Sequence, residues 1–168
     1  ELPQGYDHKY VYSHLGYNLK VTDLQAAIGV EQLRKFPSFI EKRRHNWERL
    51  HQALEPFQDK LLLPKPAENS RPSWFGFLIS VKPETGIDRN QVTKYLEEHN
   101  IQTRLLFSGN LIKHPCFDPI RGTEAYRISG GLEQTDFIMN HTFWVGVYPG
   151  MTDKMIDYMG QVIEEAVR

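Results

Sequence analysis

The second half of the chain alternates short apolar runs with amphipathic stretches, and this alternation restricts the possible fold more than any other feature. Three runs have the length of buried strands and are rich in aromatic and β-branched residues: 74–81 (WFGFLISV), 101–107 (IQTRLLF) and 142–147 (TFWVGV). Helices are predicted over three further segments: 88–100, about 132–140 and about 153–167. This order predicts an α/β layer, in which helices pack against a short sheet. Residues 108–131 contain too many Gly and Pro residues for regular structure and are predicted to form a loop.

The first half of the chain has the signals of two helices. Residues 1–21 are expected to be extended or loop. Thr22 and Ser38 each stand three residues before a Gln or a Glu, which is the capping-box pattern at a helix start. Pro37 is expected to end the first helix, and a second helix is predicted over 38–54.

Composition excludes several classes of function. A formal net charge of −1 implies no broad attraction to nucleic acid or to an anionic membrane. Cys116 is the single cysteine, so it forms no intramolecular disulfide and cannot by itself hold zinc or an iron–sulfur cluster. No apolar run has membrane-spanning length, and no metal site is expected. We expect a cytoplasmic protein, and the start at Glu1 instead of Met indicates a fragment.

Two polar side chains, Asn18 and Lys20, precede the first predicted helix. An Asn amide donates two N–H bonds and Lys is cationic, while the free N–H groups at a helix start favour anions. A phosphate is therefore a candidate ligand. Without further context, the preferred interpretation is that Asn18 lies in a turn and that Lys20 is solvated, since many loops place Asn before a capped helix.

A second candidate site follows the predicted strand 101–107. Arg104 lies inside this strand, where a charge is costly unless it is paired or faces a cleft. The strand leads into Ser108, Gly109 and Asn110, a turn that could present amides to a polar ligand. Arg suits bidentate recognition of phosphate or carboxylate. An Arg on the solvent face of a half-exposed strand is an equal alternative.

The segment HLGYNLKVTDLQAAIGVEQLRKF resembles the G-Y-N-x-[RK]-x-x-x-[LMI]-Q-A-A segment of the DegT/DnrJ/EryC1/StrS sugar aminotransferase and dehydrase family. The similarity continues through NIQTRLLFSGNLIKHPCF and TFWVGVYPGMTDKMIDYM, and it spans the chain from about Gly5 to the end. The segments YDHKYVYSHLGYNLK and TRLLFSGNL are most similar to the branch of CDP-4-keto-6-deoxy-D-glucose 3-dehydrases.

This resemblance implies the C-terminal small domain of a fold type I pyridoxal-phosphate-dependent transferase. Its short, mostly antiparallel sheet is packed by helices and preceded by two helices. Residues 1–56 would be a dimer-facing loop and linking helices at the end of a large domain, and 57–168 would be the small α/β domain.

The resemblance also implies roles for particular residues. Asn18 would contact the cofactor phosphate of the partner subunit in a homodimer. Six residues would border the substrate: Lys20, Arg104, Ser108, Gly109, Asn110 and, as a further candidate, His14. No catalytic residue and no metal ligand is expected in this chain, because the groups that hold the cofactor ring and the cluster cysteines would lie upstream.

The whole enzyme would remove the C-3 hydroxyl of a CDP-linked 4-keto-6-deoxyhexose in lipopolysaccharide deoxysugar biosynthesis. It would use pyridoxamine phosphate and a [2Fe-2S] cluster, with electrons from a partner reductase. The chain alone is expected to bind cofactor poorly and to be inactive. Two alternatives stay open: a pyridoxal-phosphate-dependent nucleotide-sugar aminotransferase of the same family, and a stand-alone binding module.

Overall fold

A computed structural model describes residues 3–5, 7, 9, 11–17 and 19–168. The chain divides into two compact units, Glu1–Phe36 and Pro37–Arg168. The helices are α1 (Asp23–Leu54), α2 (Arg89–Glu98), α3 (Glu133–His141) and α4 (Asp153–Ala166). The strands are β1 (Leu61–Leu62), β2 (Gly76–Val81), β3 (Thr103–Leu105) and β4 (Thr142–Gly146). Short 3-10 turns occur at Glu55–Phe57, Pro83–Thr85, Leu111–Lys113 and Pro115–Ile120.

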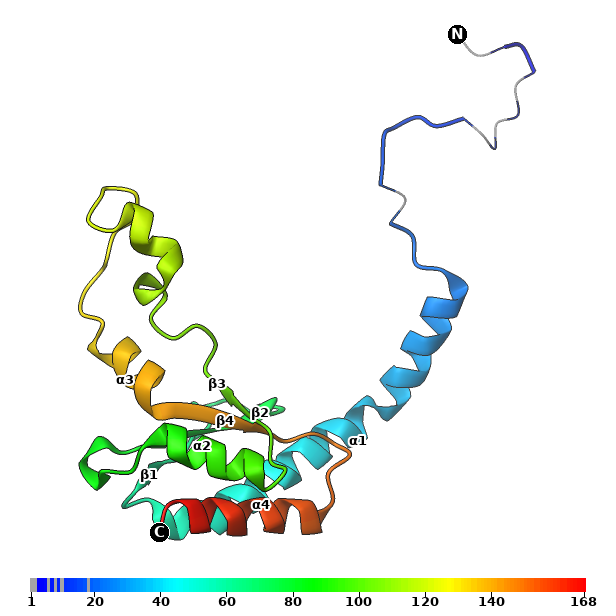
Figure 1. Cartoon of the computed structure of the whole chain (residues 1–168). Coiled ribbons are helices and arrows are strands. Elements are labelled where there is room, and N and C mark those ends of the chain that lie inside the picture. The colour runs from blue at the N-terminus through cyan, green and yellow to red at the C-terminus, as the bar shows by residue number, and fades with distance from the viewer. Residues whose placement is uncertain (1–2, 6, 8, 10, 18) are drawn as a thin grey trace. The chain divides into compact units, whose positions relative to one another are not determined.

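The second unit is built on a four-stranded sheet with the order β1-β2-β4-β3, in which every neighbouring pair is antiparallel (Figure 1). In the central pair, Phe77 lies opposite Val145 and Ile79 lies opposite Phe143. All four side chains are fully buried, because alternate residues of a strand point to the same face of the sheet. This arrangement confirms the predicted α/β fold with a short antiparallel sheet.

Three helical segments bury this face of the sheet. Helices α2 and α4 pack against each other beside the strands, and the last turns of α1 complete the layer (Figure 1). Leu50 and Leu54 of α1 and Ile156 and Ile163 of α4 have no exposed surface. The chain therefore closes one hydrophobic core, which includes the C-terminal half of the long helix.

Helices α1 and α4 approach closely at one glycine. A Cβ atom added to Gly160 would lie 2.9 Å from the Cβ of Ala53, which is closer than two carbon atoms can pack. At the rim of the same contact, Arg49 donates two hydrogen bonds to the carboxylate of Asp157, at 2.6 and 2.9 Å. Helices α1 and α4 are thus joined by close packing at Gly160 and by the ion pair between Arg49 and Asp157.

Helix α1 runs without interruption through Pro37, so the prediction of two separate helices is wrong. The Thr22 capping box is confirmed, because the Thr22 N–H donates to Gln25 Oε1 at 3.0 Å and the Gln25 N–H donates to Thr22 Oγ1 at 3.4 Å. Ser38 lies inside the helix and does not start one. A proline costs one helical hydrogen bond, whereas a break would leave four unsatisfied backbone groups at each new end.

The first unit contributes no buried residue among those that the structure describes. Apolar side chains on the first turns of α1 are largely exposed, including Leu24 at 81% and Leu33 at 70%. The contact pattern divides the chain after Phe36, and the boundary expected near residue 56 stays a prediction.

Filling the space at Gly160 should weaken the contact between α1 and α4. We expect Gly160→Leu to lower the free energy of unfolding by about 1–3 kcal/mol, because the added side chain must displace the backbone or Ala53. Gln161→Leu, at the exposed neighbouring position, is the matched control and should change it by about 0.5 kcal/mol or less. Urea unfolding measures both, and equal effects of the two variants would contradict this packing.

Candidate functional site

The predicted site residues lie in both units. In the first unit, Lys20 and His14 are exposed, and His14 Nδ1 lies 2.8 Å from the hydroxyl of Ser13. Asn18, the residue assigned to the cofactor phosphate, lies outside the described residues. The structure therefore leaves its role as a prediction.

In the second unit, Arg104 lies on the edge strand β3, directly opposite Trp144 of β4. Both residues belong to the sheet face that the core helices leave uncovered, because their neighbours Phe143 and Val145 point into the core. Phe75 packs against Trp144 with ring centroids 5.0 Å apart. Arg104 thus stands beside exposed aromatic surface, which agrees with a cleft-facing position.

The chain makes a tight turn directly after β3. Phe107 and Gly109 both have left-handed backbone conformations, with φ values of 50° and 59°. A Cβ atom at Gly109 would lie 2.7 Å from Cγ of Met139, so helix α3 approaches the turn as closely as a glycine allows. Ser108, between them, is exposed. The turn therefore presents Ser108 outward while its next residues rest on α3.

Asn110 is held by α3 and does not point to solvent. Its side chain is 2% exposed, and its Nδ2 donates to Oδ1 of Asp136 at 2.7 Å. Lys113 Nζ lies 2.8 Å from the same carboxylate oxygen. These bonds from Asn110 first, and then from Lys113, lower the pKa of the Asp136 carboxyl below its ordinary value. We name the cluster of Asn110, Lys113 and Asp136 the loop latch. The sequence patterns did not identify Asp136 as part of the site.

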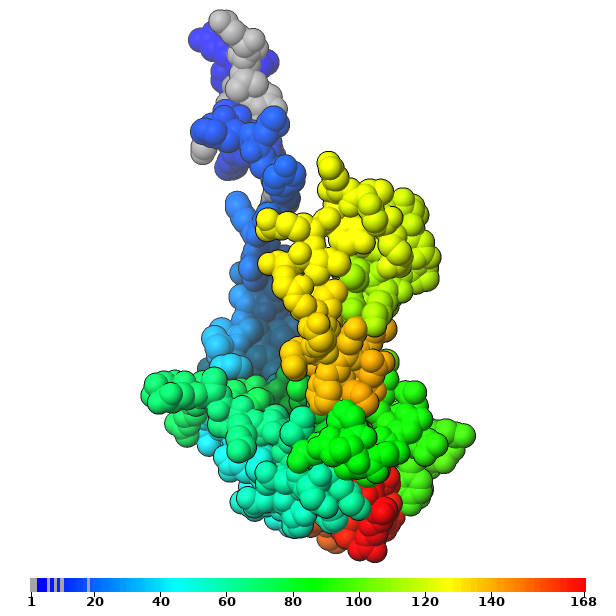
Figure 2. Space-filling model, turned by 90° about the vertical axis from the view of Figure 1, so that its left-hand side faces the viewer, coloured from blue at the N-terminus to red at the C-terminus, as the bar shows by residue number. Residues whose placement is uncertain are grey.

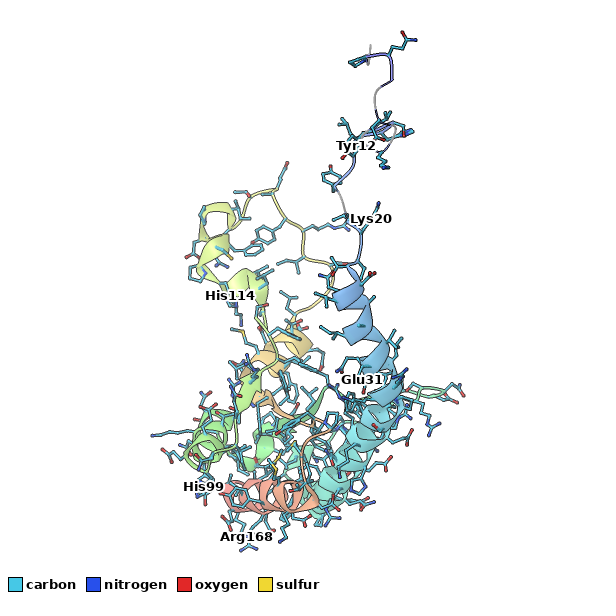
Figure 3. The ribbon with its side chains drawn as sticks, turned by 90° about the vertical axis from the view of Figure 1, so that its right-hand side faces the viewer. Tyr12, Lys20, Glu31, His99, His114 and Arg168 are labelled. Carbon is cyan, nitrogen blue, oxygen red and sulfur yellow. The ribbon has the colours of Figure 1, made fainter. Side chains whose placement is uncertain are left out.

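The rest of the loop is held by its own contacts. One ring nitrogen of His114, Nε2, lies 2.7 Å from the Ser108 carbonyl, and Arg121 donates to the Ile112 carbonyl at 2.6 Å. The rings of Phe117 and Tyr126 meet edge to face with centroids 5.4 Å apart. Figure 2 shows the loop, coloured yellow-green to yellow, standing out from the sheet and helices as one lobe. His114 marks the base of this lobe in Figure 3.

Four of the predicted residues therefore lie in the second unit, on β3 and in the turn that follows it. Arg104 and the turn at Ser108 and Gly109 adjoin, with Asn110 fixed beneath them by the latch. His14 and Lys20 belong to the other unit. Substrate binding by these six residues stays a prediction.

Comparison with known proteins identifies the family. The model of the DegT/DnrJ/EryC1/StrS aminotransferase family matches residues 2–164. The chain belongs to this family. The match covers both units and includes the turn, the latch and the exposed strand residue Arg104.

Several relatives from this family are similar along nearly the whole chain. The lipopolysaccharide biosynthesis protein RfbH of Salmonella typhimurium is 51% identical over 164 residues, which is 98% of this chain and 37% of that protein. The dTDP-4-dehydro-2,6-dideoxy-D-glucose 3-dehydratase of Saccharopolyspora spinosa is 51% identical over 166 residues, covering 99% of this chain and 35% of that protein. This chain therefore spans little more than a third of the length of these relatives.

A solved structure with the same fold is the E. coli GDP-4-keto-6-deoxy-D-mannose-3-dehydratase with bound hydrated pyridoxal phosphate. The two structures superpose with a TM-score of 0.74 at 26% sequence identity, and the match covers 97% of this chain and 40% of the E. coli protein chain. The similarity confirms that the sheet and helices form the α/β small domain of the pyridoxal-phosphate-dependent aminotransferase fold.

The described part of the chain contains neither a metal-binding cluster nor a membrane-spanning helix. Among these residues, no group of three or more His, Cys, Asp or Glu side chains is placed to hold a metal ion. No described helix is both long enough and apolar enough to cross a membrane.

Protonation of Asp136 should release the loop latch. Because the pKa of this carboxyl is lower in the folded chain, its ionised form stabilises the fold above the unfolded pKa of about 4, and this contribution disappears as the pH falls through the folded pKa. We expect the free energy of unfolding to fall less steeply between about pH 5 and pH 3 in Asp136→Asn than in the native chain.

Urea unfolding at a series of pH values measures this difference. Asp59→Asn, at an exposed position away from the loop, is the matched control and should follow the native curve. Parallel curves for Asp136→Asn and the native chain would show that ionisation of this carboxylate does not contribute to the pH dependence of the free energy of unfolding.

Proposed function

We propose that this chain is the C-terminal part of a nucleotide-sugar 3-dehydratase of deoxysugar or lipopolysaccharide biosynthesis. The observation that carries the proposal is the 51% identity to a 3-dehydratase over 99% of the chain. Aminotransferases of the family are less similar: the dTDP-4-dehydro-2,3,6-trideoxy-D-glucose 4-aminotransferase of the same organism is 25% identical over 153 residues. This difference favours dehydratase over aminotransferase.

The substrate that we propose is a CDP-linked 4-keto-6-deoxyhexose. Relatives named 3-dehydratases act on dTDP-linked and GDP-linked sugars, so the family accommodates different nucleotides. The sugar ring and its ketone are the shared features. The choice of CDP rests on the amino-acid sequences around Asn18 and Ser108, which resemble those of CDP-sugar dehydrases. This choice applies to the substrate of the whole enzyme.

In this proposal, the turn after β3 forms one wall of the substrate cleft. Arg104 supplies a charge for a phosphate or carboxylate oxygen, and Ser108 supplies a hydroxyl at the exposed point of the turn. The loop latch holds the turn in place, because Asp136 binds both Asn110 and Lys113. The chain's contribution is therefore binding and orientation of the substrate.

The relatives' cofactor does not fit the described residues alone. Pyridoxamine or pyridoxal phosphate would supply an electron sink for loss of the C-3 hydroxyl. The surface around Arg104 offers a cation and aromatic rings, but its lining contains no carboxylate for a pyridine nitrogen. Asn18 would add one phosphate contact across a homodimer, and the remaining cofactor contacts would come from a large domain. We derive no chemical step within this chain.

Further parts of the proposal concern the complete enzyme in the cytoplasm. A [2Fe-2S] cluster, which would receive electrons from a reductase, would require several cysteine ligands, whereas this chain has Cys116 alone, which is exposed. The cluster therefore depends on residues outside this chain.

The full-length protein tests the proposed activity. Purified with pyridoxamine phosphate and given CDP-4-keto-6-deoxyglucose together with the reductase and its electron donor, it should release the C-3 hydroxyl as water and yield the 3-deoxy sugar nucleotide, as followed by mass spectrometry. Transfer of an amino group to C-4 would identify the aminotransferase instead. The 168-residue chain is the control and should show neither reaction. Tight binding of cofactor and CDP-sugar by the chain alone would favour a stand-alone binding module.

Asn18 provides a residue-level prediction. In the full-length dimer, Asn18→Ala should weaken cofactor retention by about 1–3 kcal/mol, because one hydrogen bond to a charged phosphate is lost. Equilibrium dialysis against pyridoxamine phosphate measures the change. Gln4→Ala, an exposed amide in the same segment, is the control. Unchanged retention in Asn18→Ala would place that amide away from the phosphate.

A further inference from the structure

A cavity of about 550 Å³ opens at the edge of the sheet, beside the start of β3 at Thr103 and the end of β4 at Gly146. The pairing of the two strands stops at Thr103 opposite Val145, so Gly146 has no partner on that side. A Cβ atom on Gly146 would meet no other atom within 4 Å, which leaves open space beside the strand. The first half of α4 closes the other side of this edge cavity. Its volume is in the range of small-molecule sites.

The edge cavity combines an apolar lining with two cations. Its aromatic and sulfur-containing residues are Trp144, Tyr148, Met151, Met155, Tyr158 and Met159. Arg104 from β3 and Lys154 from α4 are its charged residues, and the lining contains no Asp or Glu. Neither cationic side chain forms an ion pair with a carboxylate among the described residues. The cavity is therefore complementary to an anion attached to an apolar body.

The two acidic residues in the first half of α4, Asp153 and Asp157, do not neutralise these cations. Asp153 binds Lys42 Nζ at 3.3 Å and His45 Nε2 at 2.9 Å, both on α1. Asp157 is bound by Arg49, also on α1. Because both carboxylates are engaged with α1, the positive charge of Lys154 stays available to the edge cavity.

The walls of the cavity are fixed in place before any ligand binds. The Tyr158 hydroxyl donates to the carbonyl of His99 at 3.2 Å, which joins α4 to the end of α2. His99, labelled in Figure 3, marks this end of the cavity beside its lining residue Asn100. On the other wall, the carbonyl of Tyr148 accepts a hydrogen bond at 2.8 Å from the fully buried amide of Asn46. A preformed site loses less entropy on binding than a mobile one.

We propose that the edge cavity is a binding site for a small organic anion with a planar apolar body, in which Arg104 and Lys154 hold the anionic group. Arg binds phosphate or carboxylate oxygens through two parallel N–H bonds, and Lys adds a point charge. The planar body would lie against the aromatic and methionine side chains. The edge cavity shares Arg104 with the proposed substrate cleft, but it adds Lys154 and the first half of α4, and its binding can be measured without any enzymatic activity.

Titration of the ¹⁵N-labelled 168-residue chain with 2-naphthyl phosphate tests the site. The probe should shift the amide resonances of Gly146, Lys154 and Met155 in a saturable way. 2-Naphthol, which has the same rings without the charge, should bind about tenfold or more weakly, as should inorganic phosphate, which lacks the rings.

Variants locate the contacts. Arg104→Gln and Lys154→Gln should each raise the dissociation constant about tenfold, and Gly146→Leu should do so by filling the cavity while both cations remain. Lys94→Gln, an exposed lysine on α2 outside the cavity, is the matched control and should leave binding unchanged.

Three results would overturn the proposal: no saturable shift at the three amides, equal binding of 2-naphthol, or equal weakening by Lys94→Gln. Because no activity is measured, these results do not bear on whether the full-length protein is a dehydratase.

Discussion

The antiparallel pairing of β2 with β4 is the constraint on which the rest of the second unit depends. These strands are separated in the sequence by two helices, strand β3 and a long loop, yet their register places Phe77 and Ile79 opposite Val145 and Phe143. A slip of one residue would turn these buried side chains to the opposite face. The same register places Trp144 on the uncovered face, where the pairing of β3 with β4 sets it opposite Arg104. Core formation and the position of the candidate site therefore have one common origin.

The loop after β3 shows how a segment rich in Gly and Pro can present side chains in a defined way. Its regular backbone bonds are few, and its order comes from side chains that bind carbonyl groups and from the carboxylate of Asp136. Helix α3 supplies that carboxylate and leads directly into β4. The loop is thus attached to the central strand through a helix, and a buried Asn110 performs the attachment. Binding residues on a loop need such a rigid support.

Sequence patterns predicted the fold of the second half well, whereas the local signals at Pro37 and Ser38 predicted a helix break that is absent. The strands and helices of the second half lie within a few residues of their predicted places, and the Thr22 cap is confirmed. The two-residue strand β1 was missed, because its place in the sheet depends on its pairing with β2 and not on a local sequence pattern. For the site, Arg104 and its turn were found from their charge and breakers, whereas Asp136 was missed because an acidic residue in a first helical turn has an ordinary local explanation.

The contact between Gly160 and Ala53 has a consequence for how this chain can vary. The two positions share one small volume between helices that are far apart in the sequence. A side chain at position 160 fits only if Ala53 becomes glycine or the helices move apart, so position 160 is not free to change independently of position 53. Substitutions at these positions of α1 and α4 are therefore coupled during evolution, although neither residue has a reactive or polar side chain.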